Sequence, residues 1–137
     1  MSSTKKLFTL KSSDGEAFQV EEAVALQMPS IKPMIENGSA DSGIDIPIKT
    51  GRILAMVIEY CRKHVEASGS DLRQWDTNFL KVDNSTLLGL VLAAQTLGIR
   101  DLLNRTCQAV ASVMEGKNPN QVRESFKDYL FPEEKDI

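Results

Sequence analysis

Two short stretches near the N-terminus, residues 7–11 and 16–20, alternate between apolar and polar side chains. Alternation with a period of two is typical of strands that bury one face. Asp14-Gly15 lies between the two stretches, and this dipeptide favours a tight turn because glycine accepts a positive φ and aspartate bonds nearby backbone. The pattern predicts an antiparallel β-hairpin at the start of the fold.

Residues 21–48 combine two short helical patterns with one further strand. Residues 21–26 predict one short helix, and residues 30–36 predict a second one with Ser30 as its N-cap. Residues 44–48 alternate isoleucine with a polar residue or proline, which predicts a third strand. Because Pro47 lacks an N–H donor, this strand should lie at an edge of the sheet or end there.

From residue 50 onward, apolar residues recur at the three- and four-residue spacing of amphipathic helices. Thr50 is a suitable N-cap for the first helix, and Gly98 is a suitable terminator for the central one. Asn118-Pro119 followed by Gln121 has the spacing of a capping box with proline at the first helical position. The helices predicted in this way cover residues 51–65, 71–80, 85–97, 99–114 and 119–126, with Asp71 and either Asp83 or Asn84 capping the second and third.

Strands therefore come first and helices follow, an order that indicates an α+β fold rather than a parallel sheet. A chain of 137 residues with 42% hydrophobic residues can form one or at most two domains with their own core. The longest apolar run, residues 87–94, is far shorter than the roughly 20 residues that span a bilayer, and we interpret it as a buried helix. The net charge of −3 offers no basic field to a phosphate backbone. We expect no membrane and no nucleic acid among the partners.

Residues that often mark a functional site are scarce in this chain. His64 is the only histidine, and Glu66, the acid nearest to it in the sequence, lies on a different helical face. We therefore expect a half-buried or surface histidine without a catalytic role. Cys61 and Cys107 both lie in helical patterns that predict buried thiols, and they are too few for a zinc site. Trp75, the only tryptophan, fits either a core anchor or an interface residue. We predict no enzymatic activity, no metal and no cofactor.

The predicted helix at 99–114 carries more apolar surface than a single buried face requires. Cys107 and Ala111 widen its apolar stripe toward a side that Val122 and Phe126 of the last helix could share. Two helices with such a surplus can hold a partner helix in a groove. The pattern leaves open whether the surplus binds a partner or packs on the N-terminal sheet.

Several longer motifs occur in a fixed order along nearly the whole chain. They are Leu10-Lys11-Ser12-Ser13-Asp14-Gly15-Glu16, Ile58-Glu59-Tyr60-Cys61, Trp75-Asp76, Phe79-Leu80, Cys107-Gln108 and Gly116-Lys117. In this order they resemble the S-phase kinase-associated (Skp) adaptor family, the small proteins that connect F-box proteins to a cullin in SCF ubiquitin ligases. So many matches in sequence are far more specific than a lone short motif.

The resemblance implies a BTB/POZ-type domain, a small sheet plus helices, at residues 5–66. A short variable loop at 67–71 would follow, then a helical F-box-binding extension at 72–130 and a frayed tail at 131–137. The chain would act as a non-catalytic adaptor in ubiquitin-dependent protein degradation, in the cytoplasm and nucleus.

The resemblance also implies two binding sites. The cullin N-terminal domain would contact Gln95 and Thr96. F-box proteins would bind the last two helices through Leu102, Leu103, Cys107, Val110, Ala111, Met114, Val122 and Phe126.

Three departures from the family pattern leave alternatives open. Gln95-Thr96 stands where the family usually has Asn-Tyr, and the missing tyrosine removes a large amphipathic contact. The 67–71 loop lacks the frequent acidic run, and the segment after Phe126 is shorter than usual. We favour a working adaptor. One alternative is a divergent paralogue that binds F-box proteins with weak or no cullin binding and acts outside the ligase. The other is a BTB protein that self-associates weakly through its uncovered last helices.

Overall fold

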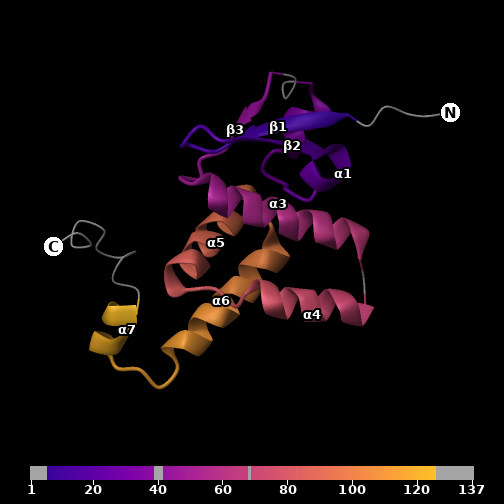
Figure 1. Ribbon diagram of the computed structural model, residues 1–137. Coiled ribbons are helices and arrows are strands. Elements are labelled where there is room, and N and C mark those ends of the chain that lie inside the picture. The colour runs from indigo at the N-terminus through magenta and orange to yellow at the C-terminus, as the bar shows by residue number, and fades with distance from the viewer. Residues whose placement is uncertain (1–5, 39–41, 68, 126–137) are drawn as a thin grey trace.

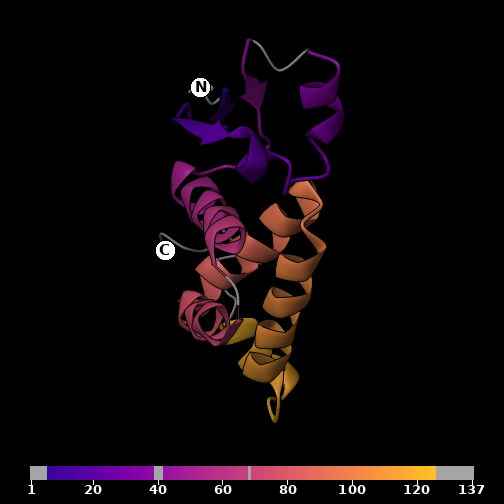
Figure 2. The ribbon, with the colours of Figure 1, turned by 90° about the vertical axis from the view of Figure 1, so that its right-hand side faces the viewer.

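The computed structural model describes residues 6–38, 42–67 and 69–125, and it has a small sheet at one end and helices over the rest (Figure 1). The sheet and the first two helices form one end of the molecule, and α6 runs from beneath them toward α7 at the opposite end (Figure 2). The predicted α+β class is confirmed, with strands first and helices after them.

The sheet has the strand order β2-β1-β3. Strands β1 (Leu7–Lys11) and β2 (Ala17–Glu21) pair antiparallel, so the predicted hairpin is confirmed, and Gly15 in its turn has a φ of 90°. Strand β3 (Ile44–Asp45) pairs parallel to β1 and is shorter than predicted. It ends before Pro47 because proline cannot donate to the ladder.

Helices α1 (Glu22–Ala25) and α2 (Lys32–Glu36) follow the hairpin. The prediction that Ser30 caps α2 is wrong, since the N-cap position is Ile31 and no side chain caps it. The backbone N–H of Ser30 instead donates to the Leu97 carbonyl at 3.1 Å. This bond ties the loop before α2 to the end of a distant helix.

Five helices form the rest of the described chain: α3 (Gly51–Glu66), α4 (Gly69–Phe79), α5 (Asn84–Leu97), α6 (Arg100–Met114) and α7 (Pro119–Ser125). Two predicted caps are confirmed, because the Thr50 side chain accepts from the N–H of Ile53 and the Asp83 side chain accepts from that of Thr86. Helix α4 begins at Gly69, so Asp71 lies in its first turn rather than at its cap, and the connection from α3 is shorter than predicted.

A hydrogen bond connects the hairpin turn to the start of α3. The carboxylate of Asp14 accepts a hydrogen bond of 3.0 Å from the N–H of Gly51, one of the donors that a helix start leaves unsatisfied. A Cβ at Gly51 would lie 2.7 Å from the Cβ of Glu16, closer than carbon atoms pack, so the glycine lets the turn approach the helix this closely.

The core lies between the sheet, α3, α5 and the first turns of α6. Its largest fully buried hydrophobic side chains are Leu10, Met28, Leu54, Leu90, Leu97 and Leu102. Trp75 packs partly buried against this core and stacks on Phe79 with ring centroids 4.9 Å apart, which favours its role as a core anchor. Within the described chain, no residue after Thr106 is buried.

Candidate partner-binding surfaces

One flank of α6 exposes apolar side chains, and we call the set Leu103, Cys107, Val110, Ala111 and Met114 the apolar flank. Cys107 and Ala111 are exposed and Met114 is 38% exposed, whereas Leu103 and Val110 are half-buried. Within the described residues, these five predicted F-box contacts lie together on one side of the helix. Leu102 does not join them, because its side chain is fully buried in the core and supports the helix from inside.

Helix α7 follows α6 in the chain after the turn at Gly116. Its predicted capping box is confirmed: Asn118 Oδ1 accepts from the N–H of Gln121 at 2.9 Å, and Gln121 Oε1 accepts from the N–H of Asn118 at 3.0 Å. Val122 is half-buried. The predicted contact Phe126 and the predicted tail at 131–137 lie outside the described residues, as do residues 126–130.

The end of α7 is held against the start of α5. The Asn84 side-chain amide donates to the Ser125 carbonyl at 3.0 Å. Because this bond satisfies one of the carbonyls left open at the end of a helix, it fixes where the last described turn sits. The end of α7 is thereby tied to α5 by a polar contact, and no residue of α7 is buried.

A second exposed patch lies on α5. Gln95 is exposed and Thr96 half-buried, and Leu92, one turn earlier on the same face, is 50% exposed. Our interpretation of residues 87–94 as a buried run is therefore wrong for Leu92. Helix α5 packs on α3 and α6, and one face remains open. We call Leu92, Gln95 and Thr96 the α5 patch.

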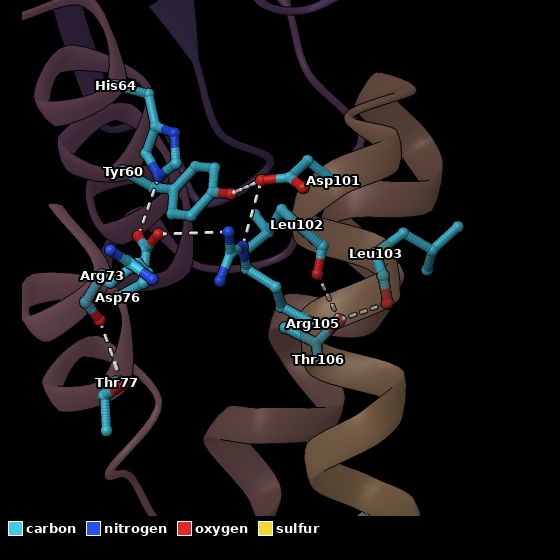
Figure 3. A network of polar contacts seen from close by, with 10 residues as sticks. All are labelled: Tyr60, His64, Arg73, Asp76, Thr77, Asp101, Leu102, Leu103, Arg105 and Thr106. Atoms are coloured by element: carbon cyan, nitrogen blue, oxygen red, sulfur yellow. Dashed lines mark hydrogen bonds and ion pairs between the residues drawn. The ribbon is translucent and has the colours of Figure 1, made fainter. Parts of the chain in front are cut away.

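A polar network joins α3, α4 and α6 at the junction between the N-terminal part and the later helices (Figure 3). His64 Nε2 lies 2.8 Å from Asp76 Oδ1, and Arg105 Nη2 lies 3.4 Å from Asp76 Oδ2. Arg105 Nε donates to Asp101 Oδ2 at 3.0 Å, and the Tyr60 hydroxyl donates to the same oxygen at 2.6 Å. His64 is half-buried as expected, and its ring stacks on Tyr60 with centroids 4.1 Å apart.

Burial and charge alter the ionisation of this network. Burial is the largest cause that raises the pKa of Tyr60, and its hydrogen bond to the Asp101 carboxylate adds to the effect. The same hydrogen bond is the largest cause that lowers the pKa of Asp101, with Arg105 contributing. Both groups therefore keep the protonation states that the hydrogen bond requires.

The two cysteines differ in environment. Cys61 is buried, and burial raises the pKa of its thiol to about 12. Cys107 is exposed on the apolar flank, so the prediction of two buried thiols is wrong for this residue. Its helix has only one face toward the core, and Leu102 and Thr106 occupy that face.

The acid partner of His64 escaped the sequence analysis because it comes from a different helix. His64 and Asp76 are 12 positions apart and lie on two different helices, and no local spacing reveals such a pair. Among the described residues, no group of three or more His, Cys, Asp or Glu side chains is arranged to hold a metal ion. No helix in the same described part combines the length and apolarity needed to cross a bilayer.

The small sheet and α1 to α3 define a POZ-type fold, and α4 to α7 form a helical extension of it. Residues 6–66 match the Skp1 family, tetramerisation domain, and residues 100–135 match the Skp1 family, dimerisation domain. The chain belongs to the Skp1 family. Members of this family are adaptors of SCF ubiquitin ligases, and their work is protein–protein interaction.

Similar proteins come mainly from plants. The chain is 49% identical to SKP1-like protein 4 of Arabidopsis thaliana, in an alignment that covers all of this chain and 94% of that protein. It is 46% identical to SKP1-like protein 1 of Oryza sativa subsp. japonica, with 96% of this chain and 90% of that protein covered. It is 46% identical to SKP1-like protein 1A of Arabidopsis thaliana, with 98% and 92% covered.

Proposed function

We propose that this protein is a non-catalytic adaptor subunit of an SCF ubiquitin ligase that bridges an F-box protein to the cullin N-terminal domain. One observation carries the proposal: the apolar flank of α6 is left open by the chain's own core. Family membership supplies the class of partner. The adaptor holds its two partners in a fixed arrangement, performs no chemistry itself, and acts in the cytoplasm and nucleus.

The F-box side of the proposal rests on the apolar flank and Val122. Cys107, Ala111 and Met114 are accessible, and Leu103 and Val110 border them half-buried. An amphipathic helix of a partner could lay its apolar face on this surface, since helices that bind in grooves contact them through apolar residues spaced three and four positions apart. Partner binding would remove from water the apolar area that folding leaves exposed.

The cullin side rests on the α5 patch. Leu92, Gln95 and Thr96 share one helical face, and the α5 helix beneath them is anchored by contacts with α3 and α6. An exposed leucine flanked by polar side chains is a suitable contact centre, because burying half of a leucine against a partner favours association by about 1 kcal/mol. Leu92 thus extends the predicted pair Gln95 and Thr96.

Charge placed on the F-box surface tests the first half of the proposal. Val122→Asp should weaken binding of a generic F-box domain at least about tenfold, because it puts a carboxylate into an apolar contact. Phe126→Asp, just beyond the described residues, should do the same. The matched control is Val65→Asp, the same change at a 43% exposed valine of α3. Full F-box affinity in both Val122→Asp and Phe126→Asp, measured by calorimetric titration, would show that the surface is wrongly assigned.

A second candidate function follows from Thr96. This half-buried threonine offers a small contact where an amphipathic ring would suit a cullin better. In this alternative the chain is a divergent paralogue that binds F-box proteins outside the ligase. Thr96→Tyr should then raise cullin affinity several-fold, and an unchanged affinity would remove this explanation.

Weak self-association is a further consequence to test. An open apolar flank can pair with a second copy when no partner is bound. Light scattering at increasing concentration should then show mass above the monomer, and Met114→Asp should restore the monomer. A wild-type chain that stays monomeric at high concentration would rule out this behaviour.

A further inference from the structure

Helix α6 has three sides with different surroundings. Leu102 and Thr106 face the core, and the apolar flank lies on one side of them. Asp101 and Arg105 lie one turn apart on the other side and reach α3 and α4. Figure 3 shows these two side chains pointing toward Tyr60 and Asp76, whereas the side chain of Leu103 points away from them. The polar network therefore holds α6 from the side opposite the apolar flank.

The charges of the network make Arg105 its central member. Two carboxylates, Asp76 and Asp101, face one guanidinium, and the imidazole of His64 contacts the far oxygen of Asp76. Asp76 is only 2% exposed, and its Oδ2 has no hydrogen bond within the described part of the chain. The 3.4 Å approach of Arg105 Nη2 is thus an ion pair without hydrogen-bond geometry. Without Arg105, this buried oxygen would lose its cationic neighbour.

Arg105 also connects α6 to α4, whereas Asp101 connects α6 to α3 directly. Its Nε binds Asp101 on its own helix, its Nη2 faces Asp76 on α4, and Asp101 in turn accepts from Tyr60 on α3. A planar guanidinium can hold two carboxylates at a fixed angle, which an ammonium cannot do. The arrangement resists rotation of α6 about its own axis.

We propose that Arg105, acting through Asp76 and Asp101, is a positioning residue that sets the rotation of α6 and so presents the apolar flank to a partner. The assignment of that partner as an F-box domain rests on the proposed function. The positioning itself is a property of the free chain, and it can be measured without any partner.

The chain contains its own pair of spectroscopic probes. Trp75 is the only tryptophan and precedes Asp76 on α4. Cys107 has an exposed thiol on α6, whereas Cys61 is buried with its thiol pKa raised to about 12, so a maleimide dye should label Cys107 selectively. Energy transfer from Trp75 to this dye reports the placement of α6 relative to α4 in the free chain. F-box titrations use the unlabelled chain.

The test compares Arg105→Gln with Arg62→Gln. Arg62 is an exposed arginine of α3 whose ion pair with Glu59 stays within that helix, so its replacement is the matched control. Arg105→Gln should change the transfer efficiency in the free chain and lower affinity for a generic F-box domain about tenfold, because a misplaced contact surface loses its hot-spot contacts. Arg105→Lys, which keeps the charge without the fork, should recover part of both effects and guards against a variant that fails to fold.

Each outcome decides separately on the positioning role and on the adaptor proposal. Transfer and F-box affinity equal to those of Arg62→Gln would overturn the positioning role while leaving the adaptor function intact. Changed transfer with unchanged F-box affinity would also overturn it, because the rotation of α6 would then not matter for binding. If Arg105→Gln changes the transfer efficiency but the wild-type chain binds no F-box domain, Arg105 does set the rotation of α6. The adaptor proposal is then overturned.

Discussion

Helix α3 and helix α6 have nearly the same length but differ in how much of themselves they bury. Helix α3 buries six of its 16 residues, whereas α6 buries two of its 15, both in its first half. Helix α7 buries none of its seven described residues. The shared core thus ends in the first half of α6, and α7 is held by polar contacts rather than by buried side chains.

This difference teaches where stability and binding reside in the molecule. Residues that fold the chain, such as Leu54, are sealed between the sheet and the helices. Residues that are candidates for binding, such as Met114 and Leu92, lie on helices whose other faces are already held. A substitution should therefore affect either folding or binding, according to the region in which it falls.

The largest expected effect is a difference in unfolding free energy between alanine substitutions at Leu54 and at Leu92. Leu54→Ala should lower the free energy of unfolding by about 3 kcal/mol, because it leaves a cavity at a fully buried site. Leu92→Ala should lower it by less than about 1 kcal/mol, since that side chain is half exposed. Urea unfolding measures both. Equal losses would contradict the division between core and open face.

Removing the N-cap of α5 and removing the N-cap of α7 should have different effects on the free energy of unfolding. Asp83→Ala removes the N-cap of α5 and should lower the global free energy of unfolding by about 1 kcal/mol. Asn118→Ala removes half of the α7 capping box and should leave the global value within about 0.3 kcal/mol, because α7 opens locally without unfolding the core.

Hydrogen exchange distinguishes the two cap variants. Amides of α7 should lose protection in Asn118→Ala while those of α3 keep it. If Asn118→Ala instead lowered the global unfolding midpoint as much as Asp83→Ala does, α7 would be part of the cooperative core and our comparison would fail.

Acid should have the smallest effect, and it should act on the hairpin turn and on the start of α5. Hydrogen bonds from Ser12 and Gly51 lower the pKa of Asp14, and hydrogen bonds from Thr86 lower that of Asp83, each from an ordinary value of 3.8. A lowered pKa in the folded state contributes stability that is present above 3.8 and is lost as pH falls below it. Because both carboxylates are exposed, screening keeps this contribution small.

A comparison of melting temperatures at pH 6 and pH 3 measures the acid effect. Asp14→Asn should show a smaller decrease between the two pH values than the wild type shows. Glu36→Gln changes an exposed acid at the end of α2 and serves as the control. A decrease of the same size in Asp14→Asn and wild type would show that the Asp14 carboxylate does not contribute.

Local signals predicted most of the helices and their ends. Thr50, Asp83, Gly98 and the pair Asn118 and Gln121 act within three or four residues, and the structure confirms each of them. Such caps depend on backbone donors and acceptors that sequence spacing alone specifies. The failures at Ser30 and Asp71 arose because a residue type that can cap does so only if tertiary contacts start the helix there.

Contacts between distant segments could not be predicted in this way. Asp14 and Gly51 are 37 positions apart, and His64 and Asp76 come from two helices whose relative rotation depends on packing. The exposure of Leu92 and Cys107 likewise depends on which neighbours cover α5 and α6. The resemblance to a known family supplied the candidate partners, and the assignments of Gln95, Thr96 and the apolar flank to particular partners stay predictions.

The most direct test of the two-sided adaptor is a calorimetric titration of a cullin N-terminal domain into this chain saturated with a generic F-box domain. We predict saturable binding with one cullin domain per chain, because the α5 patch and the apolar flank are separate surfaces. A stable F-box complex that takes up no cullin would contradict the ligase role and identify the protein as an F-box partner that acts outside the ligase.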